Sequence, residues 1–200
     1  MLILGLTGQT GAGKSTVSKI LEKYGCYHID ADLVARETID SDEKVKSELK
    51  SRFGEDVIGN DGKVNRKMLG AKAFADPQST LDLNSITHPA VNKKVQSIIA
   101  KKEQENVKAV IIDAIALFES GEDKLCDYTV SVIAPKDIRL KRITARDSIS
   151  EEKALERINA QKDEEFFSVN SDYIIKNYEP FNIYEETERL ALKLKLTQKS

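Results

Sequence analysis

The sequence lacks the features that mark secreted, membrane-spanning or nucleic-acid-binding proteins. Its 200 residues include two cysteines, Cys26 and Cys126, which are far apart and have no metal-ligand spacing, so we expect two reduced thiols. No apolar run approaches the roughly 20 residues that span a bilayer, so we expect no membrane association. The N-terminus has neither the basic region nor the length of a signal peptide, which predicts a cytoplasmic location.

The charge balance also argues against a nucleic-acid partner. Acidic and basic residues nearly cancel, and the formal net charge is −2. Binding to duplex nucleic acid needs many phosphate contacts from a basic surface, which this balance does not provide. Any recognition of phosphate must therefore come from a few well-placed groups. No obligate protein partner is evident.

What the sequence does contain is an alternation of short aliphatic runs with helical patterns. Hydrophobic residues make up 40% of the chain, enough for a core. We expect a helix over about residues 15–24, a mostly helical stretch over 42–105 that Pro77 and Pro89 interrupt, and two helices over 136–163. Strands are expected at residues 2–7, 27–29, 109–112, 128–133 and 173–175. This alternation predicts an α/β fold, a five-stranded parallel sheet with helices on both faces, in a single domain of residues 1–200.

Residues 8–15, Gly-Gln-Thr-Gly-Ala-Gly-Lys-Ser, match the phosphate-binding pattern G-x-x-x-x-G-K-[ST] in full. The glycines let backbone N–H groups approach phosphate oxygens, and the following helix N-terminus adds positive potential. The Lys14 ammonium suits the β- and γ-phosphates of ATP, and the Ser15 hydroxyl suits Mg²⁺. A chance match is disfavoured because a strand precedes the motif and a helix follows it. The predicted phosphate-binding residues are Gly8, Gly11, Ala12, Gly13, Lys14, Ser15 and Thr16.

Acidic residues follow two other predicted strands. Asp113 ends the third strand, where P-loop folds carry a second acidic residue beside the metal and phosphates, although it could instead cap the next turn. Asp30 and Asp32 follow the second strand. One of them could face the ligand cleft while the other caps a helix that begins near Leu33, and the residues alone leave both assignments open.

Together with these motifs, further segments make the chain resemble the dephospho-CoA kinase family. The matches run in order along nearly the whole chain, and only the P-loop would be specific alone. In the first half of the chain, Leu6 to Val17 match the family's P-loop, Asp30-Ala31-Asp32 with Ala35-Arg36 match D-A-D-x-x-A-R, and Thr87-His88-Pro89 match T-H-P. In the second half, Asp113 to Glu119 lie where the family has D-x-P-L-L-F-E, and Asp172 to Asn177 resemble D-x-x-I-x-N. The residues that resemble the family's lid are Arg142, Arg146-Asp147, Arg157-Ile158 and Gln161.

The resemblance implies that ATP phosphorylates the ribose 3′-hydroxyl of dephospho-CoA with the help of Mg²⁺, the last step of coenzyme A synthesis. It also implies a three-layer P-loop kinase fold with a helical CoA-binding insertion at about residues 33–105 and a lid at about 136–165. On the acceptor side, Asp32 would orient or deprotonate the hydroxyl, and Arg36, His88 and Asp113 would contact the substrate.

On the ATP side, the resemblance implies that Arg142 and Arg146 reach the phosphates when the lid closes and that Asn177 lies near the adenine. Alternatively, both arginines could lie on a solvated helix face. The sequence departs from the family where Ile115 and Ala116 replace Pro-Leu and where Lys176 replaces a common aspartate. These departures affect the shape of the substrate loop and the adenine contacts.

Two other functions stay open at this point. One is a different nucleotide or nucleoside kinase on the same core, which would share the P-loop and the lid but lack the D-A-D and T-H-P segments. The other is a regulatory P-loop protein that reads nucleotide state. GTP-dependent switches carry a base-reading N-K-x-D segment, and the sequence around Asn177 does not supply one.

Overall fold

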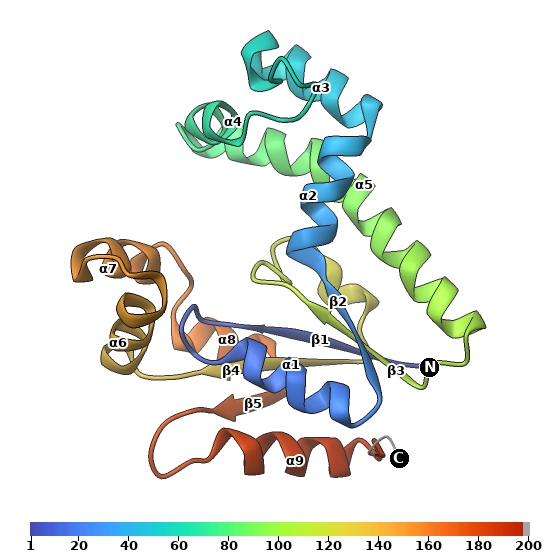
Figure 1. The fold of residues 1–200 in the computed structure, drawn as a ribbon, viewed down its shortest axis with the longest axis vertical. Helices are drawn as coiled ribbons and strands as arrows, with labels where there is room; N and C mark the ends of the chain where they lie inside the picture. Colours follow the sequence, from blue (N-terminus) through green and yellow to red (C-terminus); the bar gives the residue numbers. More distant parts are fainter. Residues whose placement is uncertain (198–200) are drawn as a thin grey trace. The chain divides into compact units, whose positions relative to one another are not determined.

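A computed structural model describes residues 1–197 and contains a five-stranded sheet in the order β2-β3-β1-β4-β5 (Figure 1). β1 pairs in parallel with β3 and β4, and β4 pairs in parallel with β5. The strands are β1 (Leu2–Gly8), β2 (Cys26–Asp30), β3 (Ala109–Asp113), β4 (Tyr128–Ile133) and β5 (Tyr173–Lys176). The predicted α/β fold with a five-stranded parallel sheet is therefore confirmed.

The strand order explains where the motifs meet. Parallel strands present their carboxyl ends at one edge of the sheet, where ligands of such sheets bind. Leu6 of β1 is in register with Asp113 of β3, so the loops that follow these two strands leave the sheet as neighbours. β3 is buried along its whole length, which fits its run of Ala, Val and Ile residues.

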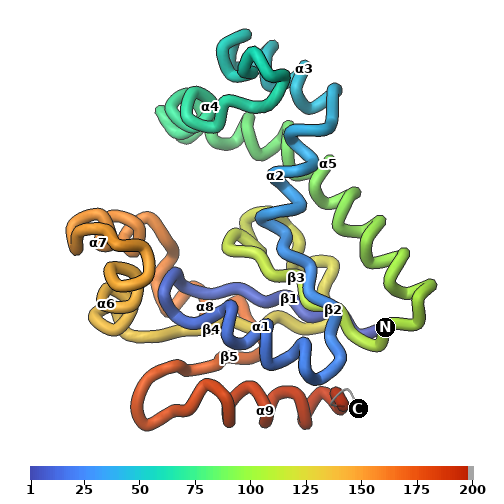
Figure 2. Tube along the Cα trace, viewed as in Figure 1, coloured from blue at the N-terminus to red at the C-terminus, as the bar shows by residue number. Residues whose placement is uncertain are grey.

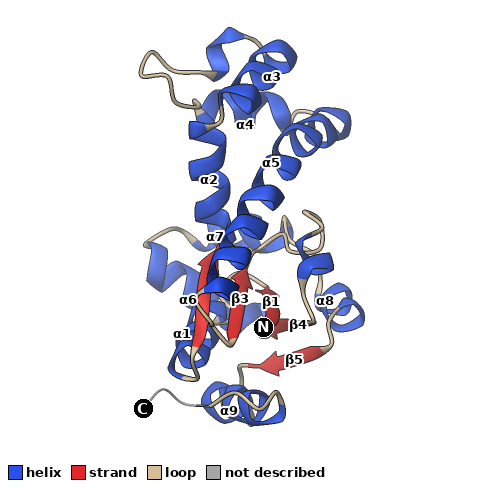
Figure 3. Cartoon of the chain, turned by 90° about the vertical axis from the view of Figure 1, so that its right-hand side faces the viewer, coloured by secondary structure: helices blue, strands red, loops and turns tan. Residues whose placement is uncertain are grey.

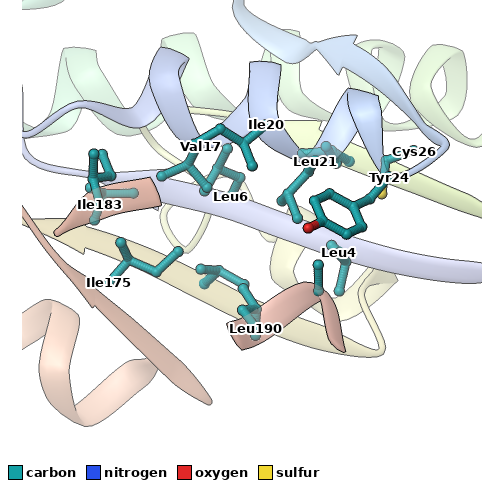
Figure 4. Packing of buried hydrophobic residues seen from close by; sticks show 14 of the residues in the cluster. Leu4, Leu6, Val17, Ile20, Leu21, Tyr24, Cys26, Ile175, Ile183 and Leu190 are labelled. Atoms are coloured by element: carbon teal, nitrogen blue, oxygen red, sulfur yellow. The ribbon is translucent and has the colours of Figure 1, made fainter. Parts of the chain in front are cut away.

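Helices cover both faces of the sheet. α1 (Lys14–Lys23) and α9 (Ile183–Lys193) bury their apolar faces against the strands in one core, with Leu4 and Leu6 of β1 at its centre (Figure 4). α8 (Glu164–Asn170) lies on the opposite face of the sheet from α1 (Figure 3). We did not expect α8 from the sequence, because its seven residues are too few for a clear helical period. Asp163 nevertheless caps it, since its side chain accepts the N–H of Phe166.

The segment predicted as a lid forms two helices, α6 (Lys136–Asp147) and α7 (Glu151–Asn159). The break falls at the expected place, where Ser148 adopts a left-handed backbone with φ 52° and Ser150 caps α7. Ile143 packs with Ala154 and Ile158 between the two helices. A short 3-10 helix, η2 (Glu122–Leu125), precedes β4.

Residues 30–101 form a second compact unit, separate from the unit made by residues 1–29 and the chain from residue 102 onward. Its path can be followed in Figure 2. Its core consists of Val45, Leu49, Phe53, Val57, Val64, Leu69 and Ala73. Its elements are α2 (Ala31–Ser41), α3 (Glu43–Phe53), η1 (Glu55–Val57), α4 (Arg66–Ala73) and α5 (Pro77–Gln104), the last of which runs on past residue 101.

The expected break at Pro89 is wrong, because Pro89 lies inside α5 and the helix continues through it. Proline removes one backbone hydrogen bond but has a φ angle that suits a helix, so a long helix held by packing on both sides of it tolerates the loss. The expected insertion, about residues 33–105, spans most of the second unit, and its role in binding CoA stays a prediction. Within residues 1–197, no helix is both long and apolar enough to cross a membrane.

Candidate active site

The loop between β1 and α1 has the conformation that the glycine pattern predicts. Gly8 and Gly13 have φ angles of 144° and 112°, in the region that side chains avoid. A Cβ atom on Gly8 would clash with the carbonyl oxygen of Val132, and one on Gly13 would clash with the side-chain amide of Asn177. Gly8 is therefore required for backbone angle and for space, whereas Gly13 is required mainly for its backbone angle, since the Asn177 amide is the end of a flexible side chain. α1 begins directly after this loop, so its free N–H groups face the region beside Lys14 and Ser15.

A cavity of about 720 Å³ opens over this loop. The loop residues Gly8, Gly11, Gly13, Lys14 and Ser15 form one side of it. α6 and the segment after β3 form the other sides, through Arg142, Ala145, Arg146 and Ile115. Its volume lies within the usual range for sites that bind small ligands. Of the other predicted phosphate-binding residues, Ala12 is buried in the loop and Thr16 lies in the first turn of α1.

Lys14, which lines this cavity, is paired with Asp113. The ammonium of Lys14 donates to Oδ1 of Asp113, and the Nε2 atom of His28 lies 3.0 Å from Oδ2 of the same carboxylate. Asp113 is 7% exposed. Burial alone would raise the pKa of Asp113, but the hydrogen bond from His28 and the charge of Lys14 outweigh it and hold the pKa below its usual value. Asp113 is therefore a buried carboxylate with a cationic partner beside the P-loop.

Arg142 and Asn177 both contact the carbonyl side of the P-loop. Nη1 of Arg142 lies 3.4 Å from the carbonyl oxygens of Gly11 and Ala12, and its Nη2 donates to the carbonyl of Asn177 at 3.1 Å. The side-chain amide of Asn177 donates to the carbonyl of Ala12 at 2.6 Å. The structure thus brings Arg142 and Asn177 to the P-loop. Their predicted contacts with phosphate and adenine stay predictions.

Arg146 lies on the cavity wall with its side chain 61% exposed. It donates to both carboxylate oxygens of Asp147, at 2.7 and 3.0 Å, and Arg157 also donates to Asp147. The hydrogen bond with Asp147 raises the pKa of Arg146 further, so the group is a permanent cation. Gln161, another residue of the predicted lid, accepts the backbone N–H of Thr10 at 2.7 Å.

The remaining predicted substrate residues belong to the second compact unit. Asp30 caps α2 by accepting the N–H of Leu33 at 2.9 Å, and Asp32 lies in the first turn of that helix. Of the two assignments left open by the sequence, the cap therefore falls to Asp30. Arg36 is exposed on α2. His88 lies on α5, and partial burial lowers the pKa of its imidazole.

Comparison with known proteins identifies the family. A family model described as dephospho-CoA kinase matches residues 2–181. A dephospho-CoA kinase of Corynebacterium diphtheriae is 37% identical over 189 residues, 94% of each chain. The chain belongs to the dephospho-CoA kinase family. A solved dephospho-CoA kinase from Campylobacter jejuni aligns over 96% of each chain with a TM-score of 0.69 and 28% identity, and a solved Thermus thermophilus protein reaches a TM-score of 0.78 at 30% identity, over 96% of this chain and 97% of its own.

The family membership confirms the resemblance and the enzyme class expected from the sequence. The family phosphorylates dephospho-CoA in the final step of coenzyme A synthesis. The comparisons therefore favour this reaction over another nucleoside kinase or a regulatory nucleotide-binding protein. The P-loop kinase fold is confirmed by the same solved structures.

Sequence analysis missed His28, whose side chain reaches Asp113 across 85 residues of sequence. No local signal could have found it, because a histidine beside tyrosine in a short strand fits many surroundings. The pairing of Lys14 with Asp113 was also not foreseen, although both residues were predicted site residues. Among the departures from the family pattern, Ile115 lines the cavity, and its carbonyl accepts the hydroxyl of Thr7 at 3.1 Å.

Proposed function

We propose that the cavity over the P-loop holds the triphosphate of ATP and that Lys14 is the principal cationic group on its β- and γ-phosphates. The observation that carries this proposal is the convergence of three positive elements on one cavity: the Lys14 ammonium, the N-terminus of α1 and the guanidinium of Arg146. Phosphoryl transfer depends mainly on positioning and on neutralising charge on the transferred group. These elements supply both functions without any covalent step on the protein.

We also propose Mg²⁺ as the cofactor, held on the protein side by the Ser15 hydroxyl. Mg²⁺ usually takes one or two protein ligands and completes its shell with water and substrate phosphates. The described residues fit that mode: Ser15 is exposed at the cavity beside Lys14, and no cluster of three metal-ligating side chains occurs within residues 1–197. When bound, the ion would neutralise phosphate charge.

For the acceptor, we propose that Asp32 receives the hydrogen bond of the ribose 3′-hydroxyl of dephospho-CoA and then its proton. Asp32 follows β2 by two residues, and its neighbour Asp30 is already engaged as the cap of α2. A carboxylate in this role orients a poor nucleophile toward the γ-phosphorus and removes its proton as the bond forms. Arg36 and His88 would contact the rest of the acceptor, and residues 33–105 would form its CoA-binding region.

Arg142 and Arg146 are proposed to act from the lid, residues 136–165, by reaching the phosphates when ATP is bound. Lid closure would exclude water, which otherwise competes for the γ-phosphoryl group. Asn177 is proposed to lie near the adenine, because it contacts Ala12 from the loop after β5. A cytoplasmic location and the absence of a nucleic-acid partner stay predictions.

A coupled assay for ADP formation tests the proposed function. With ATP and Mg²⁺, dephospho-CoA should stimulate ADP release far above the rate with AMP, pantothenate or water. Equal rates with AMP and dephospho-CoA would assign the chain to general nucleotide phosphorylation instead. Product analysis should show the new phosphate on the 3′-oxygen of the ribose. Omitting Mg²⁺ by adding EDTA should abolish the stimulation, and adding excess Mg²⁺ should restore it.

A further inference from the structure

His28 contacts the residue that holds the P-loop lysine, and it lies outside every motif that identifies the family. Its Nε2 atom lies 3.0 Å from Oδ2 of Asp113, whereas Oδ1 of Asp113 accepts the ammonium of Lys14. Since the pKa of Asp113 is lowered, the carboxylate is ionised and can only accept hydrogen bonds. The Nε2 atom of His28 must therefore carry the proton. Each carboxylate oxygen thus has its own donor, one from β2 and one from α1.

ATP binding changes this arrangement, given the proposed function. Lys14 is the group expected to move to the β- and γ-phosphates, so it must give up part or all of its pairing with Asp113. The side chain of Asp113 is 9% exposed, and water can do little to replace a lost partner there. His28 does not need to move, because it approaches the other oxygen from β2.

We propose that His28 is a positioning residue for ATP binding, which keeps the Asp113 carboxylate hydrogen-bonded while Lys14 transfers to the phosphates. Without His28, Asp113 would depend more strongly on Lys14 in the nucleotide-free enzyme. It would then lose its charged partner when ATP arrives. Both effects disfavour the ATP complex, because an unpaired buried charge is costly.

The surroundings of His28 support a specific role for its contact with Asp113. Glu22 on α1 is a second acidic neighbour, whose Oε1 lies 4.0 Å from Nδ1 of His28 and whose side chain is 46% exposed. A pair at that distance in water contributes little. Tyr27, the preceding residue on β2, stacks against the ammonium of Lys102 at 4.2 Å and gives a matched control on the same strand.

Three variants test the proposal in the full-length protein: His28→Phe, His28→Gln and Tyr27→Phe. ATP affinity should be measured by calorimetry with Mg²⁺, and both KM values by the coupled assay. His28→Phe should weaken ATP binding about tenfold, or about 1.4 kcal/mol, and leave the KM for dephospho-CoA unchanged. His28→Gln should stay within about threefold of wild type, because its amide can donate to Asp113 from a similar position. Tyr27→Phe should change neither value.

A double-mutant cycle with Asp113→Asn gives the decisive readout. In the Asp113→Asn background, His28→Phe should have little further effect on ATP affinity, because the carboxylate that it serves is gone. Unchanged ATP affinity in His28→Phe, with or without a lower Tm, would overturn the proposal and leave His28 a structural residue. A His28→Gln variant as weak as His28→Phe would also overturn it. Calorimetry with ATP needs no acceptor, so this result is independent of whether dephospho-CoA is phosphorylated.

Discussion

Replacing Lys14 with alanine separates two contributions of one ammonium group. In the structure, Lys14 pairs with Asp113, and the two side chains are 19% and 9% exposed. In the proposed ATP complex, the same group faces the β- and γ-phosphates. Lys14→Ala should therefore lower both the rate of phosphoryl transfer and the stability of the fold. The two losses differ in size, and a second substitution should restore the stability but not the rate.

The loss of rate follows from the charge that develops during transfer. Removing one preorganised donor from such a site costs about 10²- to 10³-fold in kcat, equivalent to about 2.7–4 kcal/mol. The remaining donors, which include Arg146 and the N-terminus of α1, should preserve some of the catalysis. We therefore expect a kcat reduced at least a hundredfold with dephospho-CoA as the acceptor.

The loss of stability follows from the charge left on Asp113. Breaking a buried ion pair by removing one partner costs about 3–5 kcal/mol when the other charge is left alone. Asp113 keeps its hydrogen bond from His28, so we expect a smaller loss of about 1–3 kcal/mol in the free energy of unfolding. In a protein of this size, each kcal/mol lowers Tm by about 2–4 °C.

The double variant Lys14→Ala/Asp113→Asn distinguishes the two losses. Its neutral amide no longer needs a cation, so Tm should recover most of the difference, whereas kcat should stay low. Steady-state kinetics and thermal unfolding on the same samples measure both. A Lys14→Ala enzyme with kcat within a few-fold of wild type would refute the P-loop mechanism. A double variant that regains activity would show that Lys14 acts through folding alone.

Three further predictions concern other residues. Asp32→Asn should lower kcat by about two orders of magnitude or more, with little change in ATP affinity by calorimetry. Asp30→Asn, which alters the cap of α2, should lower kcat less. The opposite order of the two kcat values would exchange the roles of Asp30 and Asp32. The folded pKa of Asp113 lies below its unfolded value of 3.8, so its contribution to stability is present above that pH and is lost as pH falls through the folded pKa. The difference in Tm between wild type and Asp113→Asn should therefore shrink as the pH falls from 5 to below 3.8. A difference that persists at low pH would contradict the assigned ionisation. Burial, followed by the neighbouring acidic groups, raises the pKa of Cys126 to about 12, so iodoacetamide at pH 8 should leave it unmodified in the folded protein and label it after denaturation, as mass spectrometry can verify.

The elements that sequence analysis placed well are those with local signals. β4 was predicted with the bounds that the structure has, because an aliphatic run at residues 128–133 ends at a proline. The P-loop was predicted from its pattern, since its glycines are required by backbone angle and space. The turn between α6 and α7 also follows from local residues, with Ser150 as the cap. In each case the signal lies within a few residues along the chain, although the space around Gly8 is set by the distant Val132.

The features that sequence analysis missed depend on contacts between distant segments. The continuation of α5 through Pro89 depends on packing of buried residues on both sides of it, such as Thr87 and Val91, which outweighs the local preference of proline. The pairing of Asp113 with Lys14 joins residues 99 positions apart, and its contact with His28 spans 85. Strand order brings these residues together, and no spacing in the sequence encodes that order. The roles of Asp32 and Arg36 rest on the family resemblance for the same reason.

The contacts on the carbonyl side of the P-loop explain how its N–H groups are presented to a ligand. A trans peptide is planar, and its C=O and N–H bonds point in opposite directions. The carbonyl of Ala12 is held by the amide of Asn177 at 2.6 Å and by Arg142 at 3.4 Å, so the N–H of Gly13 in the same peptide is turned the other way. Gly13 lines the cavity, which is where a phosphate oxygen would accept that hydrogen bond. Arg142 belongs to α6 and Asn177 follows β5, so a helix of the predicted lid and the loop expected to meet adenine both fix the orientation of this peptide. If ATP contacts either element as proposed, its binding would be coupled, through this one peptide unit, to the geometry of the phosphate site.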